Sequence, residues 1–384
     1  PKIADVYYML DLIRTQGVVT YWKGRNLYIN TRHLTPGPLE EKKEGTMRSS
    51  IFLLGAMLGR FGEVDLEYPG GWVIGDRPVN WHISHLNKMG VFFCDSSERI
   101  RAKVSKLTGC EHVLPFPSVG VTENLIMAAV LAEGVTTIYN AACEPYIQQL
   151  CKMLCRMGAK IEGIASILLR IEGVKQLGGT EHTMLPDMIE VGSFIGMAAM
   201  TQSELTIKDV SYQNLGIIPA QFARLGIQFE QRGDDIYIPQ QDHYSIESFI
   251  DGSIMTIADA PWPGLTPDLL SIFLVVATQA KGTVLIHQKM FESRLFFVDK
   301  LIEMGAQIIL CDPHRAVVIG HDRQFQLKGG KMTSPDIRAG IALLIAAMSA
   351  SGTSRIDNIG QIDRGYENIE ERLNRLGANI TRVE

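Results

Sequence analysis

The chain has 384 residues, of which 46% are hydrophobic and 21% charged, and its formal net charge is −5. This composition is typical of a globular protein with more than one core, and the acidic balance argues against a nucleic-acid partner. The longest apolar stretch, residues 339–348, is too short to span a bilayer, and the first thirty residues show no signal peptide. Six sparse cysteines form no disulfide framework and favour a cytoplasmic location.

Six glycines recur along the chain at intervals of about 70 residues. Each follows an apolar stretch of helical spacing and precedes small or β-branched residues, as in LCRMG-AKI and LIEMG-AQI. Glycine readily takes the left-handed conformation that ends a helix, and we expect a strand after each one, for example at 227–229 and 378–380. The period predicts one α/β unit copied six times, with the first unit truncated. The glycines are Gly17, Gly90, Gly158, Gly226, Gly305 and Gly377.

Strand-like and helical patterns alternate throughout the chain. Residues 166–174, 203–210 and 282–288 are predicted strands, whereas 218–226 and 293–305 are predicted helices. The best boundary lies near Pro186, which precedes the apolar helix predicted at 189–200. We therefore expect two domains of three units each, residues 1–186 and 187–384.

A Pro-Asp pair opens a predicted helix three times, at Asp187, Asp268 and Asp336. Thr266 and Ser334 precede the last two pairs as predicted N-caps. An aspartate at this position stabilises a helix through its dipole, so the pattern alone does not mark a catalytic group.

Some cysteines and histidines are spaced closely enough to suggest a metal site. Cys151 and Cys155 lie one helical turn apart with Cys143 nearby, and His82 and His85 form a similar pair. No second pair with zinc spacing follows, so we interpret all five as packing residues and expect no metal.

Four arginines occur in turns rich in glycine or proline, or at helix starts: Arg48, Arg77, Arg338 and Arg364. Such guanidinium groups bind carboxylate or phosphate through two parallel hydrogen bonds. Each one alone is more often part of a surface ion pair. Their occurrence in three different repeats favours convergence on one anionic substrate.

Several long strings resemble the enolpyruvyl transferase family. They are the turn at 69–82, PSVGVTEN at 117–124, LAEGVTTIYNAACEP at 131–145 and the C-terminal string from Ile362. The resemblance covers the whole chain. It implies an α/β fold of two domains, each an inside-out prism of three βαβαββ-type units, with the active site in the cleft between the domains.

The resemblance also implies a reaction, in which the enolpyruvyl group of phosphoenolpyruvate is transferred to the 3-hydroxyl of UDP-N-acetylglucosamine and phosphate is released. This is the first committed step of peptidoglycan synthesis, which serves cell-wall formation, cell shape and cell division. It needs no cofactor, and its partners are these two small molecules. Asp268 is similar to the family base, and Arg77, Arg338 and Arg364 to its phosphoenolpyruvate ligands. The nucleotide-sugar contacts implied are Arg48, Arg77, Pro78, Val79, Asn80, Trp81, Ser118, Val119, Gly120, Asp268 and Met290.

The chain departs from the family pattern at several positions. Trp72 stands where the family has a proton-donating cysteine or aspartate, and an indole has no proton to give near neutral pH. A Lys-Asn pair that grips phosphoenolpyruvate in the family is expected ahead of Pro1. Asn80 replaces an aspartate in the nucleotide-sugar cradle. Further departures occur at Cys143, Met188 and Pro267.

These departures leave two alternatives open. One is an impaired paralogue or fragment that binds UDP-sugar without turnover. The other is an enzyme with a different acceptor, such as shikimate 3-phosphate. The strings at 77–81 and 117–124 favour the nucleotide sugar over that acceptor.

Overall fold

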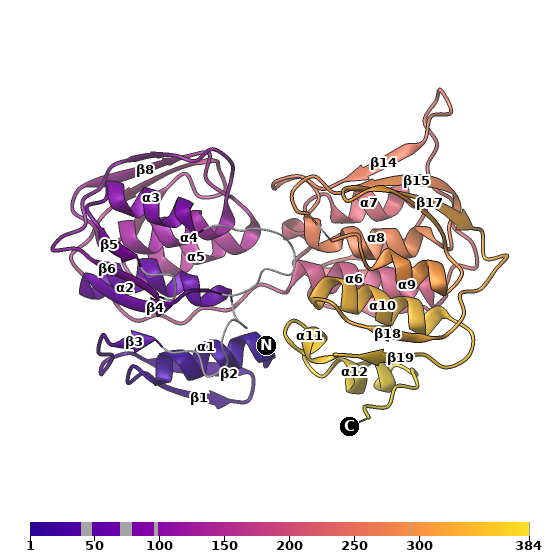
Figure 1. The fold of residues 1–384 in the computed structure, drawn as a ribbon, viewed down its shortest axis with the longest axis horizontal. Helices are drawn as coiled ribbons and strands as arrows, with labels where there is room; N and C mark the ends of the chain where they lie inside the picture. Colours follow the sequence, from indigo (N-terminus) through magenta and orange to yellow (C-terminus); the bar gives the residue numbers. More distant parts are fainter. Residues whose placement is uncertain (40–47, 70–78, 96–98, 293, 384) are drawn as a thin grey trace. The chain divides into compact units, whose positions relative to one another are not determined.

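The computed structural model describes residues 1–39, 48–69, 79–95, 99–292 and 294–383 (Figure 1). The described residues up to Leu185 form one compact unit, and those from Pro186 onward form a second. We call these the first and second units. The functional division into domains 1–186 and 187–384 stays a prediction.

Three four-stranded sheets share one topology. In each, two parallel strands lie beside two further strands that are joined antiparallel. Their strands and helices follow the order βαβαββ along the chain. These repeats are β3 Pro38–Leu39, α2 Leu53–Phe61, β4 Glu63–Glu67, α3 Asn80–Lys88, β5 Phe92–Asp95 and β6 Arg99–Lys103; β7 Glu111–Val113, α4 Val119–Ala129, β8 Val135–Tyr139, α5 Pro145–Arg156, β9 Lys160–Glu162 and β10 Leu168–Glu172; and β14 Met255–Ala258, α8 Leu270–Ala277, β15 Lys281–His287, α9 Val298–Glu303, β16 Gln307–Asp312 and β17 Arg315–His321.

Three smaller sheets complete the six repeats. The N-terminal sheet is an antiparallel pair, and the C-terminal sheet is a parallel pair. The elements are α1 Ala4–Arg14, β1 Val19–Lys23 and β2 Asn26–Asn30; α6 Met188–Met200, β11 Leu205–Ile207, α7 Ile218–Arg224, β12 Glu230–Arg232 and β13 Asp235–Ile238; and β18 Lys331–Thr333, α10 Ile337–Ser349, β19 Arg355–Asp357, α11 Gly360–Asp363 and α12 Ile369–Arg375. The predicted class, an α/β fold of repeated units, is confirmed.

All six repeat glycines adopt the predicted left-handed conformation, with φ between 85° and 108°. Two of the strands predicted to follow them are wrong. After Gly226 the strand begins only at Glu230, because the Gln241 side chain accepts the Gln228 N–H at 2.7 Å. At 378–380 no strand forms, because the Asn374 side chain bonds both the N–H and the carbonyl of Ile380.

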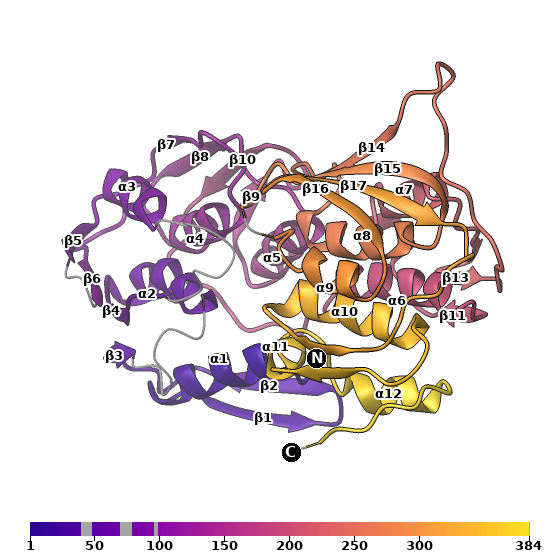
Figure 2. The same cartoon turned by 45° about the vertical axis from the view of Figure 1, so that its right-hand side comes forward.

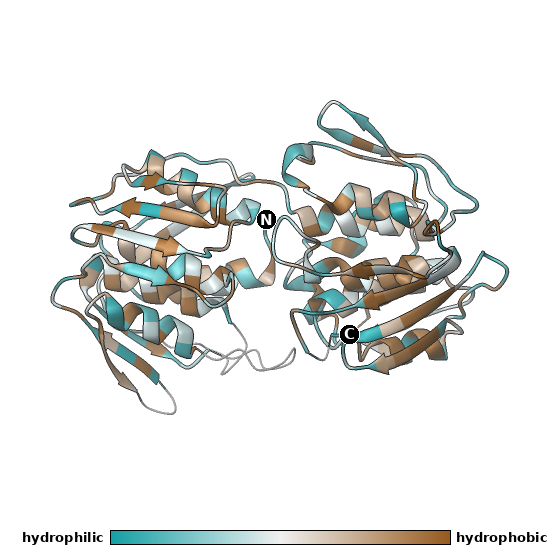
Figure 3. Ribbon diagram, turned by 90° about the horizontal axis from the view of Figure 1, so that it is seen from above, coloured by the Kyte–Doolittle hydropathy of each residue, from teal (hydrophilic) through white to brown (hydrophobic). Residues whose placement is uncertain are grey.

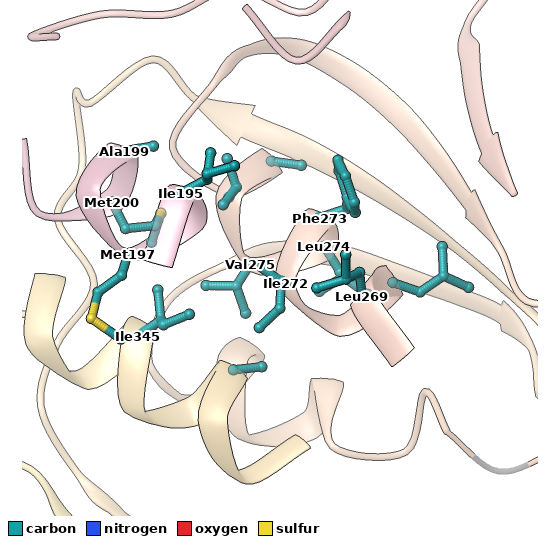
Figure 4. Close-up of a cluster of buried hydrophobic side chains, with 14 of the residues drawn as sticks. Ile195, Met197, Ala199, Met200, Leu269, Ile272, Phe273, Leu274, Val275 and Ile345 are labelled. Carbon is teal, nitrogen blue, oxygen red and sulfur yellow. The ribbon is translucent and has the colours of Figure 1, made fainter. Parts of the chain in front are cut away.

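In each unit, central helices lie behind the sheets (Figures 1 and 2). In the second unit these are α6, α8 and α10, and every side chain of α8 is buried. Figure 4 shows Ile195, Ile272, Val275 and Ile345 from the three helices packed together. Gly196 of α6 permits this close approach, since a Cβ there would stand 2.5 Å from Ile272 Cγ2.

In the first unit α2 and α4, the first helices of the two four-stranded repeats, occupy the corresponding place. Apolar (brown) and polar (teal) positions alternate along the strands that cover the helices (Figure 3). Within the described ranges no helix is both long and apolar enough to cross a membrane.

The three Pro-Asp pairs do begin helices, but their caps differ in part from the prediction. Asp187 and Asp336 are themselves N-cap residues. The Asp187 carboxylate accepts one backbone N–H of the first turn, and the Asp336 carboxylate accepts two. Thr266 caps the short 3-10 helix η3 Pro267–Leu269 as predicted. The prediction for Ser334 is wrong, because its hydroxyl instead donates to the Asp336 carbonyl at 3.1 Å.

Candidate active site

Asp268 lies in η3, directly before the buried helix α8, and its carboxylate contacts two arginines of the second unit. Arg294 Nη1 is 2.7 Å from Oδ1, and Arg338 Nη2 is 3.0 Å from Oδ2. All three side chains are largely shielded from solvent, with exposed fractions of 28%, 12% and 21%. One carboxylate is therefore held between two guanidinium groups.

The charges of these arginines control the ionisation of Asp268. Burial by itself would raise the carboxyl pKa, but the positive charges of Arg338 and Arg294 outweigh it and lower the pKa to about 2. Asp268 is consequently a carboxylate at neutral pH. Its attraction in turn raises the pKa of Arg338, which stays charged despite its burial.

Arg338 is placed by the first turn of α10. Its backbone N–H donates to the Asp336 carboxylate at 2.7 Å, and its carbonyl accepts the Ser271 hydroxyl at 3.0 Å. These bonds connect the start of α10 to α8, the helix that follows Asp268. The Pro-Asp cap at Asp336 thus positions the arginine that meets Asp268.

The segment after α11 also lies against Arg338. A Cβ on Gly365 would stand 3.9 Å from Arg338 Nη1 and 2.9 Å from Ile337 Cγ2, so this approach requires glycine. Burial raises the pKa of the Tyr366 hydroxyl, and the nearby positive charge of Arg338 opposes that rise. Arg364 is the next residue before Gly365, and its Nη1 donates to Gln361 at 3.2 Å. The structure therefore brings Asp268, Arg338 and the Arg364 segment together.

A small cavity of about 10 Å³ lies beside this cluster. Gln288 is 1% exposed, and neither polar atom of its side chain has a hydrogen-bond partner among the described residues. The same holds for Arg294 Nε. A cavity of this size holds about one water molecule, which would satisfy such groups. Its walls are formed by Pro267, Leu270, Ser271, Gln288, Arg294, Leu295, Asp336, Arg338 and Ala339.

Met290 is in the loop between β15 and α9, which also carries Arg294. The buried carboxylate of Asp259 accepts the backbone N–H groups of Lys289 at 2.5 Å and Met290 at 3.2 Å. The Met290 side chain is 37% exposed. Asp259 therefore fixes the backbone of this loop and leaves the methionine side chain accessible.

In the first unit, the predicted nucleotide-sugar residues gather around His82. A Cβ on Gly120 would stand 3.3 Å from the His82 ring. Trp81 meets Phe116 edge to face, with ring centroids 6.1 Å apart. Burial is the main cause that lowers the pKa of His82 to about 4, and the positive charge of Arg48 lowers it further. Arg48 therefore lies near the same ring. The described parts of the two predicted cradle strings, 79–81 and 117–124, thus come together, with Arg48 close by.

Ser118 is the N-cap of α4, and its hydroxyl accepts the Val121 N–H. The N–H groups of Val119 and Gly120 are the first of this helix and have no acceptor within it. Val79 is the N-cap of α3 and is buried, whereas Asn80 is exposed. Two helix N-termini, which favour anions, therefore meet at this place.

Three predicted site residues, Trp72, Arg77 and Pro78, lie outside the described residues. The packing interpretation is confirmed for His82, His85, Cys143 and Cys151, which are all buried. No group of three histidine, cysteine or acidic side chains in the described part of the chain is arranged to hold a metal ion.

Sequence reasoning missed Arg294, Tyr366 and Phe116. Arg294 lies four residues after Met290, and Tyr366 two residues after Arg364. Neither spacing nor residue type showed that they lie near Asp268 and Arg338. Phe116 directly precedes the PSVGVTEN string. An aromatic residue next to a predicted nucleotide cradle was the available signal.

The architecture is that of the enolpyruvyl transferases. The enolpyruvyl transferase NikO from Streptomyces tendae superposes with a TM-score of 0.85 at 20% identity, over 99% of this chain and 88% of NikO. EPSP synthase from Acinetobacter baumannii gives 0.71 at 17% identity, over 100% and 90% of the two chains. The chain belongs to the EPSP synthase (3-phosphoshikimate 1-carboxyvinyltransferase) family, whose model matches residues 1–373.

Curated relatives are considerably more similar in sequence. A UDP-N-acetylglucosamine 1-carboxyvinyltransferase from Bacteroides fragilis is 65% identical over 390 residues, covering 100% of this chain and 90% of the relative. Proteins of the same name from Porphyromonas gingivalis and Bradyrhizobium diazoefficiens are 60% and 46% identical. They match 100% of this chain, and the match covers 90% and 88% of their own lengths.

Proposed function

We propose that this chain transfers the enolpyruvyl group of phosphoenolpyruvate to the 3-hydroxyl of UDP-N-acetylglucosamine, with release of phosphate. This is the first committed step of peptidoglycan synthesis. The observation that carries the proposal is the 65% identity to a UDP-N-acetylglucosamine 1-carboxyvinyltransferase over the full length of this chain. The charged cluster at Asp268 supplies the groups that this chemistry needs. The free thiols of all six cysteines accord with a reaction in the cytoplasm.

We assign Asp268 the role of accepting the proton of the sugar hydroxyl. A carboxylate with a pKa of about 2 is a weak base at neutral pH, because efficient proton transfer needs a pKa closer to that of the medium. An anionic substrate bound to Arg294 and Arg338 would compete for the same N–H donors. Asp268 would then lose part of the positive field and become more basic when the substrate is in place.

The arginines of the second unit are the proposed ligands of phosphoenolpyruvate. Arg338 and Arg294 face one carboxylate already, and their forked N–H donors match phosphate and carboxylate geometry. The 364–366 segment lies against Arg338, which favours Arg364 as a third ligand. Arg77 keeps the same proposed role on the sequence resemblance alone.

The first unit is the proposed holder of the nucleotide sugar. Trp81 and Phe116 are 40% and 49% exposed, so their edge-to-face pair offers an aromatic surface to the uracil ring. The α4 N-terminus at Ser118, Val119 and Gly120 suits the diphosphate, with Arg48 nearby. Pro78, Val79 and Asn80 belong to the same proposed cradle, and Met290 keeps its proposed role as a sugar contact on the sequence resemblance alone.

By the sequence resemblance, Trp72 occupies the position of the family's proton donor. It does not supply the proton, because an indole N–H does not ionise near neutral pH. We propose that the methylene carbon is protonated by another acid. No finding favours the impaired alternative, and close relatives with full-length matches carry the enzyme's name.

The proposed reaction and the family's reaction with shikimate 3-phosphate differ in the acceptor substrate. Phosphate release should be measured with phosphoenolpyruvate and either UDP-N-acetylglucosamine or shikimate 3-phosphate. We expect the nucleotide sugar to react at least ~100-fold faster, because polar groups built for one acceptor reject another strongly. Faster release with shikimate 3-phosphate would overturn the proposal. Calorimetric binding of UDP-N-acetylglucosamine without phosphate release would favour the impaired alternative.

A further inference from the structure

Asp259 is a buried carboxylate at the end of strand β14, beside the loop that carries Arg294. Strands β14 and β15 are parallel neighbours, with Ala258 opposite His287 (Figures 1 and 2). The backbone N–H of Asp259 donates to the His287 carbonyl at 3.4 Å, so the pairing continues to the point where β15 ends. The exposed fraction of Asp259 is 0%. A carboxylate buried in this way must find its hydrogen-bond partners within the protein.

The partners of this carboxylate are two consecutive backbone N–H groups of the loop. Asp259 Oδ1 accepts from Lys289 at 2.5 Å, and Oδ2 accepts from Met290 at 3.2 Å. Both oxygens therefore bind the same stretch of main chain. Backbone N–H groups make stronger hydrogen bonds to a carboxylate than to a neutral acceptor. The two bonds together fix the direction in which the chain leaves β15.

Phe291, the residue after Met290, contacts Arg294. The guanidinium carbon of Arg294 lies 4.7 Å from the centroid of the Phe291 ring, which is a cation–π contact. The same guanidinium pairs with Asp268, since Nη1 is 2.7 Å from Oδ1. The Arg294 side chain is only 12% exposed, and a cation–π contact is stronger where water is excluded. The loop thus supplies both the arginine and the ring against which its guanidinium rests.

These contacts form a path from Asp259 to the charged cluster. Asp259 holds the main chain at Met290, and the ring of the following phenylalanine contacts the guanidinium that pairs with Asp268. An arginine side chain has many rotamers, and ordering it when a ligand binds costs free energy. Contacts that order the side chain before the ligand arrives reduce this cost.

We infer that Asp259 and Phe291 are positioning residues that hold the Arg294 guanidinium in the orientation needed to bind phosphoenolpyruvate. This inference rests on the proposed function. Without the two hydrogen bonds of Asp259, or without the Phe291 ring, Arg294 loses its orientation and binds the substrate more weakly. Asp259 also fixes the backbone of Met290, the proposed sugar contact, whereas the Phe291 ring contacts the arginine.

The test compares Asp259→Asn, Phe291→Leu and their double variant with the wild type. Asparagine keeps the shape of aspartate, but its NH₂ group meets one of the two backbone N–H groups and cannot accept from it. Leucine keeps an apolar side chain and removes the aromatic ring. Steady-state kinetics give kcat and the KM for each substrate, and thermal melting gives Tm.

Each variant has a matched control in the second unit, at a loop that carries no proposed site residue. The Asp234 carboxylate also accepts two backbone N–H groups, from Ser211 at 3.1 Å and from Tyr212 at 2.8 Å, so Asp234→Asn is the control for Asp259→Asn. Phe249 makes a cation–π contact with Arg224 at 5.9 Å, so Phe249→Leu is the control for Phe291→Leu. The controls separate loss of such a contact in general from loss of the path to Arg294.

We expect KM for phosphoenolpyruvate to rise about fivefold in Phe291→Leu and at least about tenfold in Asp259→Asn. KM for UDP-N-acetylglucosamine should rise in Asp259→Asn, through Met290, and should not change in Phe291→Leu. The double variant should match Asp259→Asn, because both residues act through Arg294. Both controls should keep the wild-type KM for each substrate, whatever their Tm. Additive effects in the double variant, or a site variant with the kinetics of its control, would overturn the inference.

A second measurement is independent of activity and does not require Asp259→Asn to fold. Urea unfolding of Phe291→Leu, Arg294→Met and their double variant gives the coupling between the ring and the guanidinium. We expect the shifts of the unfolding midpoint to be non-additive, whereas the same cycle of Phe249→Leu with Arg294→Met should be additive. Additive shifts in the first cycle would overturn the inference. Wild-type protein that releases no phosphate would instead count against the proposed function, and the cycle would still decide whether Phe291 holds Arg294.

Discussion

At the scale of single residues, the site depends on one carboxylate that two guanidinium groups hold in its ionised form. The sequence resemblance named Asp268 and Arg338 as candidate site residues, and the structure pairs their side chains at 3.0 Å. It did not point to Arg294, because the residues around it read as part of an ordinary amphipathic helix. Only the folded chain shows that Arg294 Nη1 is 2.7 Å from Asp268.

The ion pairs of Asp268 predict a pH-dependent contribution to stability. The carboxyl pKa falls from 3.8 to about 2 on folding, so the contribution is complete above pH 3.8 and is lost as the pH falls toward 2. Asp268→Asn should therefore lower the free energy of unfolding of the second unit by about 2 kcal/mol at pH 7. The difference from wild type should shrink between pH 4 and pH 2.

Urea unfolding at pH 7, 4 and 3 measures this difference. The matched control is Asp312→Asn, since Asp312 is paired with Arg315 at the surface at 2.8 Å. That exposed pair should contribute far less to stability, because solvent screens its charges. A deficit in Asp268→Asn that stays constant from pH 7 to pH 3 would contradict the assignment of the low pKa.

At the scale of helices and strands, close helix contacts hold the candidate site in place. Asn124 of α4 accepts the Gly55 N–H of α2 at 2.7 Å and donates to the Ile51 carbonyl at 3.0 Å. Its side chain also bonds His82 of α3 at 3.0 Å. A Cβ on Gly55 would stand 2.2 Å from the Asn124 carbonyl oxygen. This contact fixes α3 and α4, whose N-termini form the proposed nucleotide-sugar cradle.

Gly55→Ala should accordingly destabilise the first unit. Alanine favours a helix over glycine by about 1 kcal/mol, but a clash with rigid backbone costs about 1–3 kcal/mol and also displaces α2. We expect a net loss, together with weaker binding of UDP-N-acetylglucosamine in calorimetry. Gly360→Ala is the control, because a Cβ there meets nothing within 4 Å. A Gly55→Ala protein as stable as wild type would refute the close contact.

The helices and strands also show how much of the fold local sequence patterns predict. The glycine period and the apolar stretches predicted the repeated unit, because helix ends and strand starts are local properties. The strands expected at 227–229 and 378–380 do not form, because the side-chain amides of Gln241 and Asn374 make hydrogen bonds to the backbone there. Ser334 does not cap its helix, because Asp336 is the N-cap residue instead. Local patterns do not reveal such competition.

At the scale of the whole molecule, the fold alone does not decide the acceptor. NikO shares the architecture at 20% identity, and the family model bears the name of a shikimate phosphate enzyme. Function therefore depends on particular sites within a shared scaffold. In this chain the two prospective sites belong to different units: the charged cluster of Asp268 to the second, and the helix N-termini near His82 to the first. The sequence strings pointed to residues in both places but not to the contacts between them.

The central claim is that Asp268 accepts a proton during enolpyruvyl transfer to UDP-N-acetylglucosamine. Phosphate release by Asp268→Asn at saturating concentrations of both substrates tests it most directly, with Asp312→Asn as control and calorimetry to verify that the nucleotide sugar still binds. Because general-base catalysis contributes about 10²–10⁴-fold, we predict that kcat falls at least about 100-fold, while the control keeps the wild-type rate. A folded Asp268→Asn protein that turns over within about threefold of wild type would contradict the account.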